Sequence, residues 1–205
     1  GGHRVSTTHR PAQREDVGTL ARRFAEALDA VGGRTHPVRD EESARAEVAR
    51  ICAERPALAD RDPVLESVVA GLTRVEDPWQ AQVGVTTATA AAAETGTIVL
   101  VFDTDHPRST GLVPPVHVAV VPADRLLPTY QDAVDHLGTL RPLPSGVRFT
   151  TGPSSSGDIE LTLVRGMHGP VELHVVLVGF SPDEPGTPSP ARDDNATAPD
   201  DRETA

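Results

Sequence analysis

The sequence of 205 residues contains no lysine, and all 19 of its basic side chains are arginines. Schiff-base catalysis, a pyridoxal-phosphate anchor and the standard phosphate-binding loop each require a lysine amino group, so these chemistries are excluded. The single cysteine, Cys52, cannot by itself hold an iron–sulfur cluster, a cysteine-rich zinc site or an internal disulfide. No cofactor is therefore evident from the residues.

Aromatic residues are also scarce, at 3% of the chain, and the net charge is −11. Few rings are available to stack on bases and the acidic balance repels phosphate backbones, so we expect no nucleic-acid partner. The chain has no run of about 18 apolar residues, which argues against a membrane span. The free thiol and the lack of an export signal predict a cytoplasmic protein.

The two ends of the chain differ in composition from its middle. Residues 181–205 carry five prolines and seven acidic residues against two arginines, and their only hydrophobic residues are alanines. Such a segment cannot bury enough apolar surface to offset its ordering entropy, which predicts a disordered acidic tail. Residues 1–14 are expected to form a flexible N-terminal segment. Between them, residues 15–180 are long enough for one domain.

Helix and strand patterns alternate through this domain. Apolar residues at 3- and 4-residue spacing predict helices, and continuous apolar runs predict buried strands. Buried strands that alternate with helices are typical of an α/β fold with a largely parallel sheet, whose ligands bind beyond the carboxyl ends of the strands. The predicted helices cover residues 16–31, 40–55, 62–72, 87–93, 129–137 and 158–163, and the predicted strands cover residues 36–38, 57–59, 83–86, 97–102, 116–121, 147–150 and 172–178.

The first candidate site residues follow the strand at 83–86. Thr86 is followed by small residues that let a ligand approach, although tight packing of a helix on the sheet is the more common reason for such residues. Beyond it, a turn places the carboxyl group of Glu94 beside the hydroxyls of Thr95 and Thr97, with Gly96 between them. Glu94 can act as nucleophile or base if burial raises its pKa. The alternative is a structural turn in which Glu94 and Thr95 bind backbone amides.

A second group of candidates surrounds the strand at 116–121. Arg108 can bind a carboxylate or phosphate, or lie on the surface. His117 lies within a hydrophobic strand, where a hydrogen-bonded core histidine is more common than a catalytic one. As a functional residue it would assist Glu94.

The third group lies in the glycine- and serine-rich segment that precedes residues 158–163. There Gly152 and Ser154 would present unpaired amides and a hydroxyl to an anion, if a helix begins at Asp158. The alternative is that Ser156 or Asp158 caps that helix. Glu160 and His168 complete the candidate ligand-binding residues. No close ligand spacing supports a metal site built from these residues and His117, so none is expected.

Five of these segments occur in one order along the chain, and together they resemble LUD-domain proteins. The resemblance covers about residues 17–180. The chain departs from the usual pattern of the family in three places. Ser155 replaces a basic residue, which removes a charge available to an anion, Ser156-Gly157-Asp158 stands for Thr-Ala-Asp, and Gln82 replaces a common acidic residue. The five segments are Val-Gly-Val-Thr at 83–86, Ala-Glu-Thr-Gly-Thr at 93–97, residues 108–117, Gly-Pro-Ser at 152–154 with Asp-Ile-Glu at 158–160, and Gly-Met-His-Gly-Pro at 166–170.

The resemblance implies a three-layer α/β domain similar to the NagB/RpiA/CoA-transferase-like fold. It further implies a part in oxidising L-lactate to pyruvate, beside partner proteins that contain iron–sulfur clusters, with this chain as the cluster-free component. Similar folds also include coenzyme A transferases, which use a glutamate nucleophile. A stand-alone enzyme acting on an acyl or phosphate-bearing molecule through Glu94 is therefore the alternative.

Overall fold

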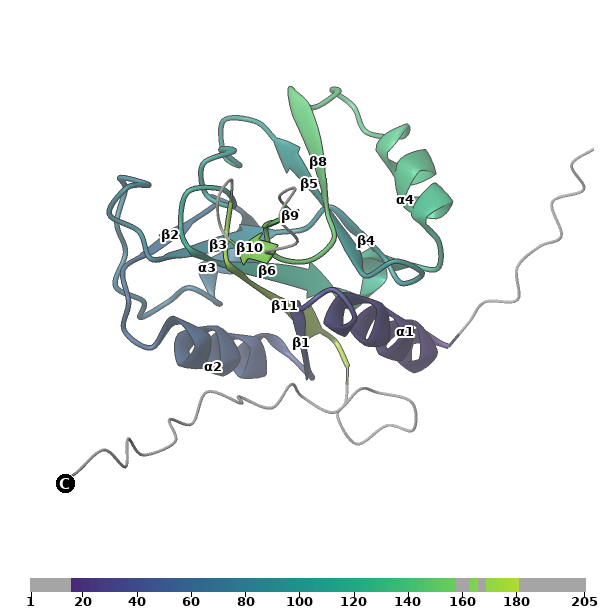
Figure 1. Ribbon diagram of the computed structural model, residues 1–205, viewed down its shortest axis with the longest axis horizontal. Coiled ribbons are helices and arrows are strands. Elements are labelled where there is room, and N and C mark those ends of the chain that lie inside the picture. The colour runs from purple at the N-terminus through teal and green to yellow at the C-terminus, as the bar shows by residue number, and fades with distance from the viewer. Residues whose placement is uncertain (1–15, 158–162, 166–168, 181–205) are drawn as a thin grey trace, which may run out of the picture.

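The computed structural model describes residues 16–157, 163–165 and 169–180. At its centre lies a five-stranded sheet in the order β1-β11-β6-β3-β2, and each neighbouring pair of strands in it is parallel (Figure 1). The prediction of an α/β fold with a largely parallel sheet is confirmed. The five strands are β1 Arg34–Val38, β2 Ala57–Ala59, β3 Val83–Thr87, β6 Val116–Pro122 and β11 Glu172–Val178.

Helices cover both faces of this large sheet. Val116, Val118 and Val120 of β6 pack with α2 (Glu41–Cys52) and α3 (Pro63–Glu66). Ala119 and Val121, which alternate with those valines, pack on the opposite face with α1 (Val17–Asp29). Figure 1 shows α1 and α2 on the two sides of the edge formed by β1 and β11. The alternation along β6 therefore separates two hydrophobic cores.

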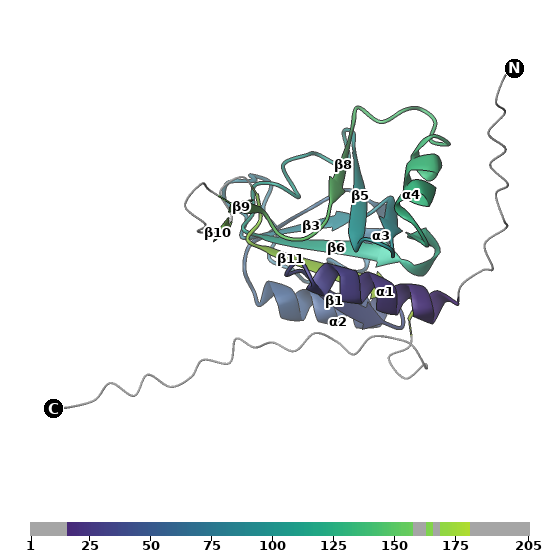
Figure 2. The same ribbon diagram turned by 45° about the vertical axis from the view of Figure 1, so that its right-hand side comes forward.

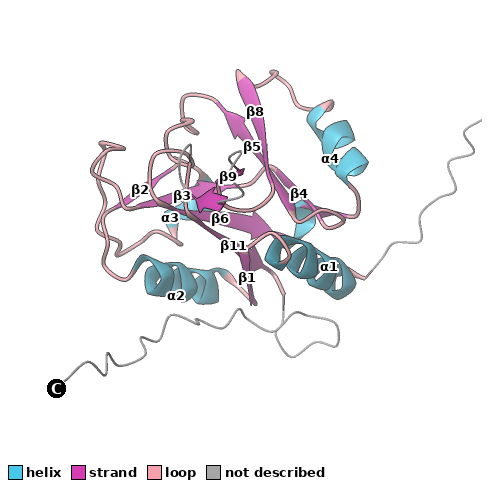
Figure 3. Ribbon diagram, in the orientation of Figure 1, coloured by secondary structure: helices cyan, strands magenta, loops and turns pink. Residues whose placement is uncertain are grey.

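A second, smaller sheet shares the α1 side of the large sheet, and its strand order is β7-β4-β5-β8. Its strands run at a steep angle to β3 and β6, as Figure 2 shows. The helix α4 (Tyr130–Leu137) packs beside it (Figure 3). Ala133 of this helix contributes to a third core with Ala90, Ala92 and Val99. The remaining elements are β4 Ala90–Ala92, β5 Thr97–Phe102, η1 Ala123–Arg125, β7 Leu126–Leu127, β8 Gly146–Thr150, β9 Ser155–Gly157 and β10 Leu163–Arg165.

Side-chain caps set the starts of α2, α3 and α4, whereas Asp16, which the sequence predicts as the cap of α1, makes no side-chain cap hydrogen bond. The Asp40 carboxylate accepts the Ser43 amide at 2.8 Å, and the Asp62 carboxylate accepts the Val64 amide at 2.8 Å. At α4, the Thr129 hydroxyl accepts the amide of Asp132 while the Asp132 carboxylate accepts the amide of Thr129, which is a capping box. Within the described residues, no helix is both long enough and apolar enough to cross a membrane.

A chain of polar side chains, with two buried histidines at its centre, connects α2 to the edge of the large sheet. An oxygen of Glu47 lies 2.7 Å from Nδ1 of His36, and Nε2 of His36 lies 3.0 Å from Nδ1 of His174. His174 then contacts Glu172 at 3.3 Å. Burial, together with the neighbouring His36, lowers the pKa of His174 to about 4. These contacts tie together β1 and β11, which are distant in sequence.

The helix predicted at residues 87–93 is wrong. Residues 90–92 form β4, which pairs antiparallel with β5 and parallel with β7. Helix propensity is a weak preference that tertiary pairing overrides. Alternate alanines of β4 face two different cores, and their small side chains suit a strand that is covered on both sides. The predicted turn at 94–96 is present, but it joins two strands.

Two further helix predictions and one strand prediction need correction. The third helix ends at Glu66 rather than Leu72, and the following turns include Gly71 with a φ of +88°. Of the helix predicted at 158–163, the last residue, Leu163, lies in β10, which pairs antiparallel with β9; residues 158–162 lie outside the described residues. β5 was expected in the parallel sheet and instead pairs antiparallel with β4 and β8 in the small one.

Candidate functional site

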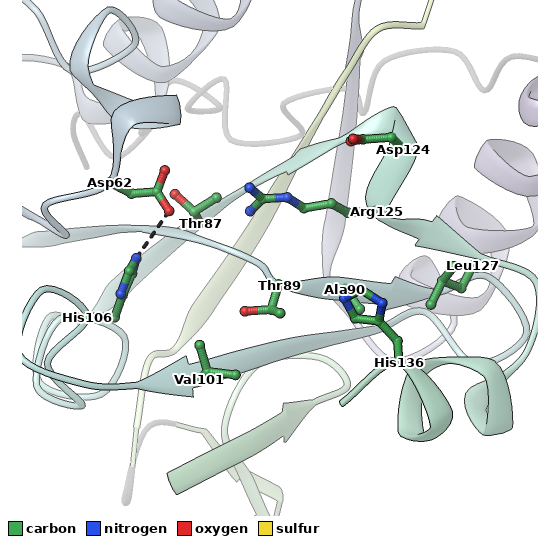
Figure 4. A pocket seen from close by; sticks show the side chains of 10 residues that line it. All are labelled: Asp62, Thr87, Thr89, Ala90, Val101, His106, Asp124, Arg125, Leu127 and His136. Carbon is green, nitrogen blue, oxygen red and sulfur yellow. Dashed lines mark hydrogen bonds and ion pairs between the residues drawn. The ribbon is translucent and has the colours of Figure 1, made fainter. Parts of the chain in front are cut away.

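A cavity of about 370 Å³ lies where β2, β3 and β6 reach their carboxyl ends, between the two sheets (Figure 4). The size is in the range of small-molecule sites. The position is the one at which ligands bind parallel α/β sheets. We call it the carboxyl-edge cavity, and its lining residues are Asp62, Thr87, Thr89, Ala90, Val101, His106, Asp124, Arg125, Leu127 and His136.

One wall of the carboxyl-edge cavity is a histidine held between two carboxylates. Nε2 of His106 lies 3.1 Å from Oδ2 of Asp62, and Nδ1 lies 2.8 Å from Oδ1 of Asp103. Burial alone would lower the pKa of His106, but the hydrogen bonds to Asp103 and Asp62 raise it overall. Since the other oxygen of Asp62 caps α3, the carboxylate is fixed in orientation.

Asp60 lies behind this wall, directly after β2. It is 7% exposed, and its Oδ1 has no hydrogen-bond partner among the described residues. Burial raises the pKa of Asp60 to about 6, and the neighbouring Thr110 hydroxyl and His106 oppose the shift only in part. A buried carboxyl group with a pKa near neutrality is suited to accept or donate a proton.

The opposite wall carries a cation. Nη1 of Arg125 donates to the carbonyl oxygen of Ala88 at 2.9 Å, which fixes the side chain. Figure 4 shows its guanidinium pointing into the cavity toward Thr87. The Thr87 hydroxyl is buried and lacks a hydrogen-bond partner within the described part of the chain. Acceptors on one side and donors on the other thus face a shared space.

A second cavity, of about 620 Å³, adjoins the first through Thr89 and Val101, which line both. Its other lining comes from Asp103, Thr104 and residues 140–145, the segment that follows α4. The two cavities together leave room for a ligand longer than the carboxyl-edge cavity alone.

His117, a predicted catalytic residue, lies away from these cavities in the middle of the large sheet. It is 1% exposed, and its Nε2 lies 2.8 Å from the hydroxyl of Thr86, another predicted site residue. Gly111 covers the ring: a Cβ there would lie 3.3 Å from Nε2. Burial lowers the pKa of His117 to about 3, assisted by the positive charge of Arg148. The imidazole is therefore neutral at pH 7.

The structure brings Gly152 and Ser154 to the same place as His117. These three residues, with Arg148 and Thr150, line a space of only about 10 Å³, which is room for about one water molecule. Arg148 also donates to the carbonyl oxygen of Gly111 at 3.1 Å. We call this group of residues the His117 cluster; its side chains fill the space between the sheets.

The turn between β4 and β5 holds the other predicted residues. Oε2 of Glu94, which is exposed, accepts the Tyr130 amide at 3.1 Å, so it supports the start of α4. The Thr95 and Thr97 hydroxyls bond each other at 2.7 Å. Gly96 has a φ of +63°, and a Cβ there would lie 2.5 Å from the Leu28 amide nitrogen of α1. The turn thus packs directly on a helix backbone.

The remaining predicted residues are separate from these groups. Arg108 is exposed and stacks over the Phe102 ring at 5.4 Å. Asp158, Glu160 and His168 lie outside the described residues. Among the residues that the structure describes, no three His, Cys, Asp or Glu side chains are placed to hold a metal ion.

Sequence reasoning missed the residues that line the carboxyl-edge cavity. Asp62 lies shortly after β2, Thr87 ends β3, and Arg125 follows β6. The rule that ligands bind at carboxyl ends points to all three once the parallel strands are assigned. The rule does not point to His106, because this residue lies in the loop after β5, which belongs to the small sheet.

Comparison with known proteins identifies related sequences. Residues 76–178 match the family model described as LUD domain. The chain is 31% identical over 194 residues to lactate utilization protein C of an Exiguobacterium species, a match that covers 83% of this chain and 84% of that protein. Lactate utilization protein C of Bacillus subtilis is 38% identical over 112 residues, which cover 53% of this chain and 47% of that protein.

A solved structure has the same fold. A DUF162 family protein from Deinococcus radiodurans superposes with a TM-score of 0.63 at 20% identity, over 80% of this chain and 99% of that one. At this level of identity the likeness concerns the fold alone.

Proposed function

Because the chain belongs to the LUD-domain family, we propose that it is a component of L-lactate utilization, in the oxidation of L-lactate to pyruvate together with iron–sulfur partner proteins. The observation that carries this proposal is the 31% identity to a lactate utilization protein C along 84% of that protein's length. The match extends well beyond residues 76–178, to which the family model is confined.

The chemistry of the chain supports a division of labour with its partners. An iron–sulfur cluster is held by several cysteine thiolates, and this chain has one cysteine. Cys52 is buried on α2, and burial raises its pKa to about 11, so the thiol is protonated at pH 7. In this proposal the partners carry the clusters, while this chain binds a small anionic ligand or holds the assembly together.

Deletion of the gene in the organism that encodes it tests the proposal. We expect growth on L-lactate as sole carbon source to be lost and growth on glucose to be unchanged, with growth on L-lactate restored by the wild-type gene. An affinity-tagged copy should co-purify with an iron-containing protein. Normal growth of the deletion strain on L-lactate, with no iron-containing protein recovered, would refute it.

A second candidate function is a stand-alone enzyme acting on an acyl or phosphate-bearing small molecule. The observation that favours it is Asp60, a buried carboxyl group that lines a separate cavity of about 310 Å³, which adjoins the carboxyl-edge cavity at Asp62. Glu94, by contrast, is an exposed acceptor for a helix amide. A thermal-shift screen of coenzyme A esters and sugar phosphates tests this alternative. A shift that Asp60→Asn removes and Glu94→Gln retains would assign the function to the cavity.

A further inference from the structure

We propose that the carboxyl-edge cavity binds a small molecule that carries both an oxyanion and a hydroxyl group, with Arg125 holding the oxyanion and Asp62 accepting the hydroxyl. The proposal deepens the proposed function, since L-lactate belongs to this chemical class. The proposed function enters this proposal only in the choice of L-lactate as one of the two ligands to be tested.

Arg125 supplies the anion-binding half of the site. A guanidinium has five N–H donors, and among the described residues Arg125 commits one nitrogen, Nη1, to the carbonyl oxygen of Ala88. That bond anchors the side chain while the remaining donors face the cavity (Figure 4). A fixed, planar donor group of this kind matches the two oxygens of a carboxylate or phosphate.

Asp62 supplies the hydroxyl-binding half. Its Oδ1 accepts the Val64 amide and its Oδ2 lies 3.1 Å from Nε2 of His106, so both oxygens are held in place. Each carboxylate oxygen has two acceptor positions, which leaves further ones for a ligand. His106, itself bound to Asp103, acts here as a positioning residue for Asp62.

The two halves do not neutralise each other. Within the described part of the chain, no ion pair joins Arg125 to Asp62, although both line the same cavity. Thr87, which is 5% exposed, also lines the cavity, and its buried hydroxyl has no hydrogen-bond partner among the described residues. Buried polar groups in proteins are normally paired, so this hydroxyl has an unused hydrogen bond beside the cavity.

The oxyanion can belong to a hydroxycarboxylate or to a phosphate ester of a polyol, and matched probes distinguish the two. Calorimetric titration of the full chain with L-lactate is compared with propionate, which lacks the hydroxyl. Titration with D-ribose 5-phosphate is compared with D-ribose, which lacks the anion. We expect L-lactate or D-ribose 5-phosphate to bind with a Kd of about 1 mM or tighter, and its matched analogue to bind about 10-fold more weakly.

Variants then locate the site. Arg125→Gln and Asp62→Asn should each raise the Kd of the bound probe about 10-fold or more, since each removes a hydrogen bond to a charged group. Asparagine is as good a helix cap as aspartate, so Asp62→Asn should keep α3 and the fold intact. The matched controls are Arg108→Gln and Asp105→Asn, which change exposed residues outside the cavity lining and should leave the Kd unchanged.

Three outcomes would overturn the proposal: no binding of L-lactate or D-ribose 5-phosphate, unchanged binding in Arg125→Gln, or equal loss of binding in Arg108→Gln. If none of these probes binds while the deletion strain still fails to grow on L-lactate, this site is refuted and the proposed function stands. If a probe binds as described while the deletion strain grows normally on L-lactate, the site stands and the proposed function is refuted.

Discussion

His117 and His106 lie in two regions of the same molecule and have opposite surroundings. His117 is enclosed between the two sheets, with the Thr86 hydroxyl as its partner and the positive charge of Arg148 nearby. His106 borders an open cavity and lies between two carboxylates. Burial lowers the pKa of the first, whereas its acidic partners raise the pKa of the second. The neighbours, not the residue type, decide the charge of each imidazole.

The comparison separates two kinds of space in this fold: one filled by side chains and one left for a ligand. The His117 cluster encloses about 10 Å³, and the carboxyl-edge cavity holds about 370 Å³. Substitutions in the first region should therefore change stability, while substitutions that line the second should change binding.

The largest expected effect is the pH dependence that His117 gives to stability. Its pKa is about 3 in the folded chain and near 6.5 when unfolded, so the unfolded chain gains a proton first as the pH falls. Stability from this group is complete above pH 6.5 and is lost toward pH 3, about 5 kcal/mol in all. His117→Gln should flatten this part of the pH profile in urea unfolding. An unchanged slope would show that His117 has the same pKa in the folded and the unfolded chain.

The next effect concerns Asp60, whose raised pKa has the opposite sign. The unfolded carboxyl ionises near pH 3.8 and the folded one near 6, so the folded state is penalised above pH 6 by about 3 kcal/mol. Asp60→Asn mimics the protonated form. Its free energy of unfolding should exceed that of wild type at pH 8, and the difference should vanish below pH 4. A variant that is less stable than wild type at pH 8 would contradict this account.

A smaller effect tests the packed region at Gly96. Gly96→Ala forces a Cβ against the backbone of α1 at a φ of +63°, and should lower the free energy of unfolding by about 2 kcal/mol. Gly71→Ala is the matched control, because Gly71 has a φ of +88° and no atom within 4 Å of its Cβ position. The control should cost about 1 kcal/mol, from backbone strain alone. Equal losses in thermal or urea unfolding would show that the contact with α1 is unimportant.

The smallest effect is expected at His106, which is partly exposed. Its raised pKa stabilises the fold below pH 6.5, and that contribution is lost as the pH rises through the folded pKa. His106→Gln should therefore lower the free energy of unfolding by about 1 kcal/mol or less at pH 5.5, and by still less at pH 9. A larger loss at pH 9 than at pH 5.5 would show that His106 stabilises the fold as a neutral ring.

The elements that sequence reasoning predicted are those in which local chemistry and burial agree. Asp40 and Thr129 cap the helices that they were expected to begin, and the apolar run at 116–121 is the buried β6. The error at 87–93 has a physical origin: alanine favours a helix in isolation, whereas here β5 and β7 supply strand partners on both sides. Pairing with distant strands is not visible in a local pattern.

For the candidate site, the sequence predicted residues that do lie together, but not the cavity in which a ligand could bind. Thr86, His117, Gly152 and Ser154 do gather, but around a space filled by their own side chains. The carboxyl-edge cavity is lined by residues from β3, α4 and the segments after β2 and β6, and single polar residues such as Asp62 are unremarkable until the sheet order joins them. The order of the strands in the sheet decides which carboxylate lies near which arginine, and a local sequence pattern does not contain that order.

The position of β11 in the large sheet has a consequence for biosynthesis. β1, the first strand to be made, has only β11 as its neighbour in that sheet, and β11 is the last strand of the described chain. His36 and His174, which meet across these strands, are 138 positions apart. At about 5–20 residues per second, translation of that interval takes roughly 7 to 30 s. Throughout this time β1 and the apolar face of α2 lack the strand that completes their packing, so apolar surface of the nascent chain stays exposed.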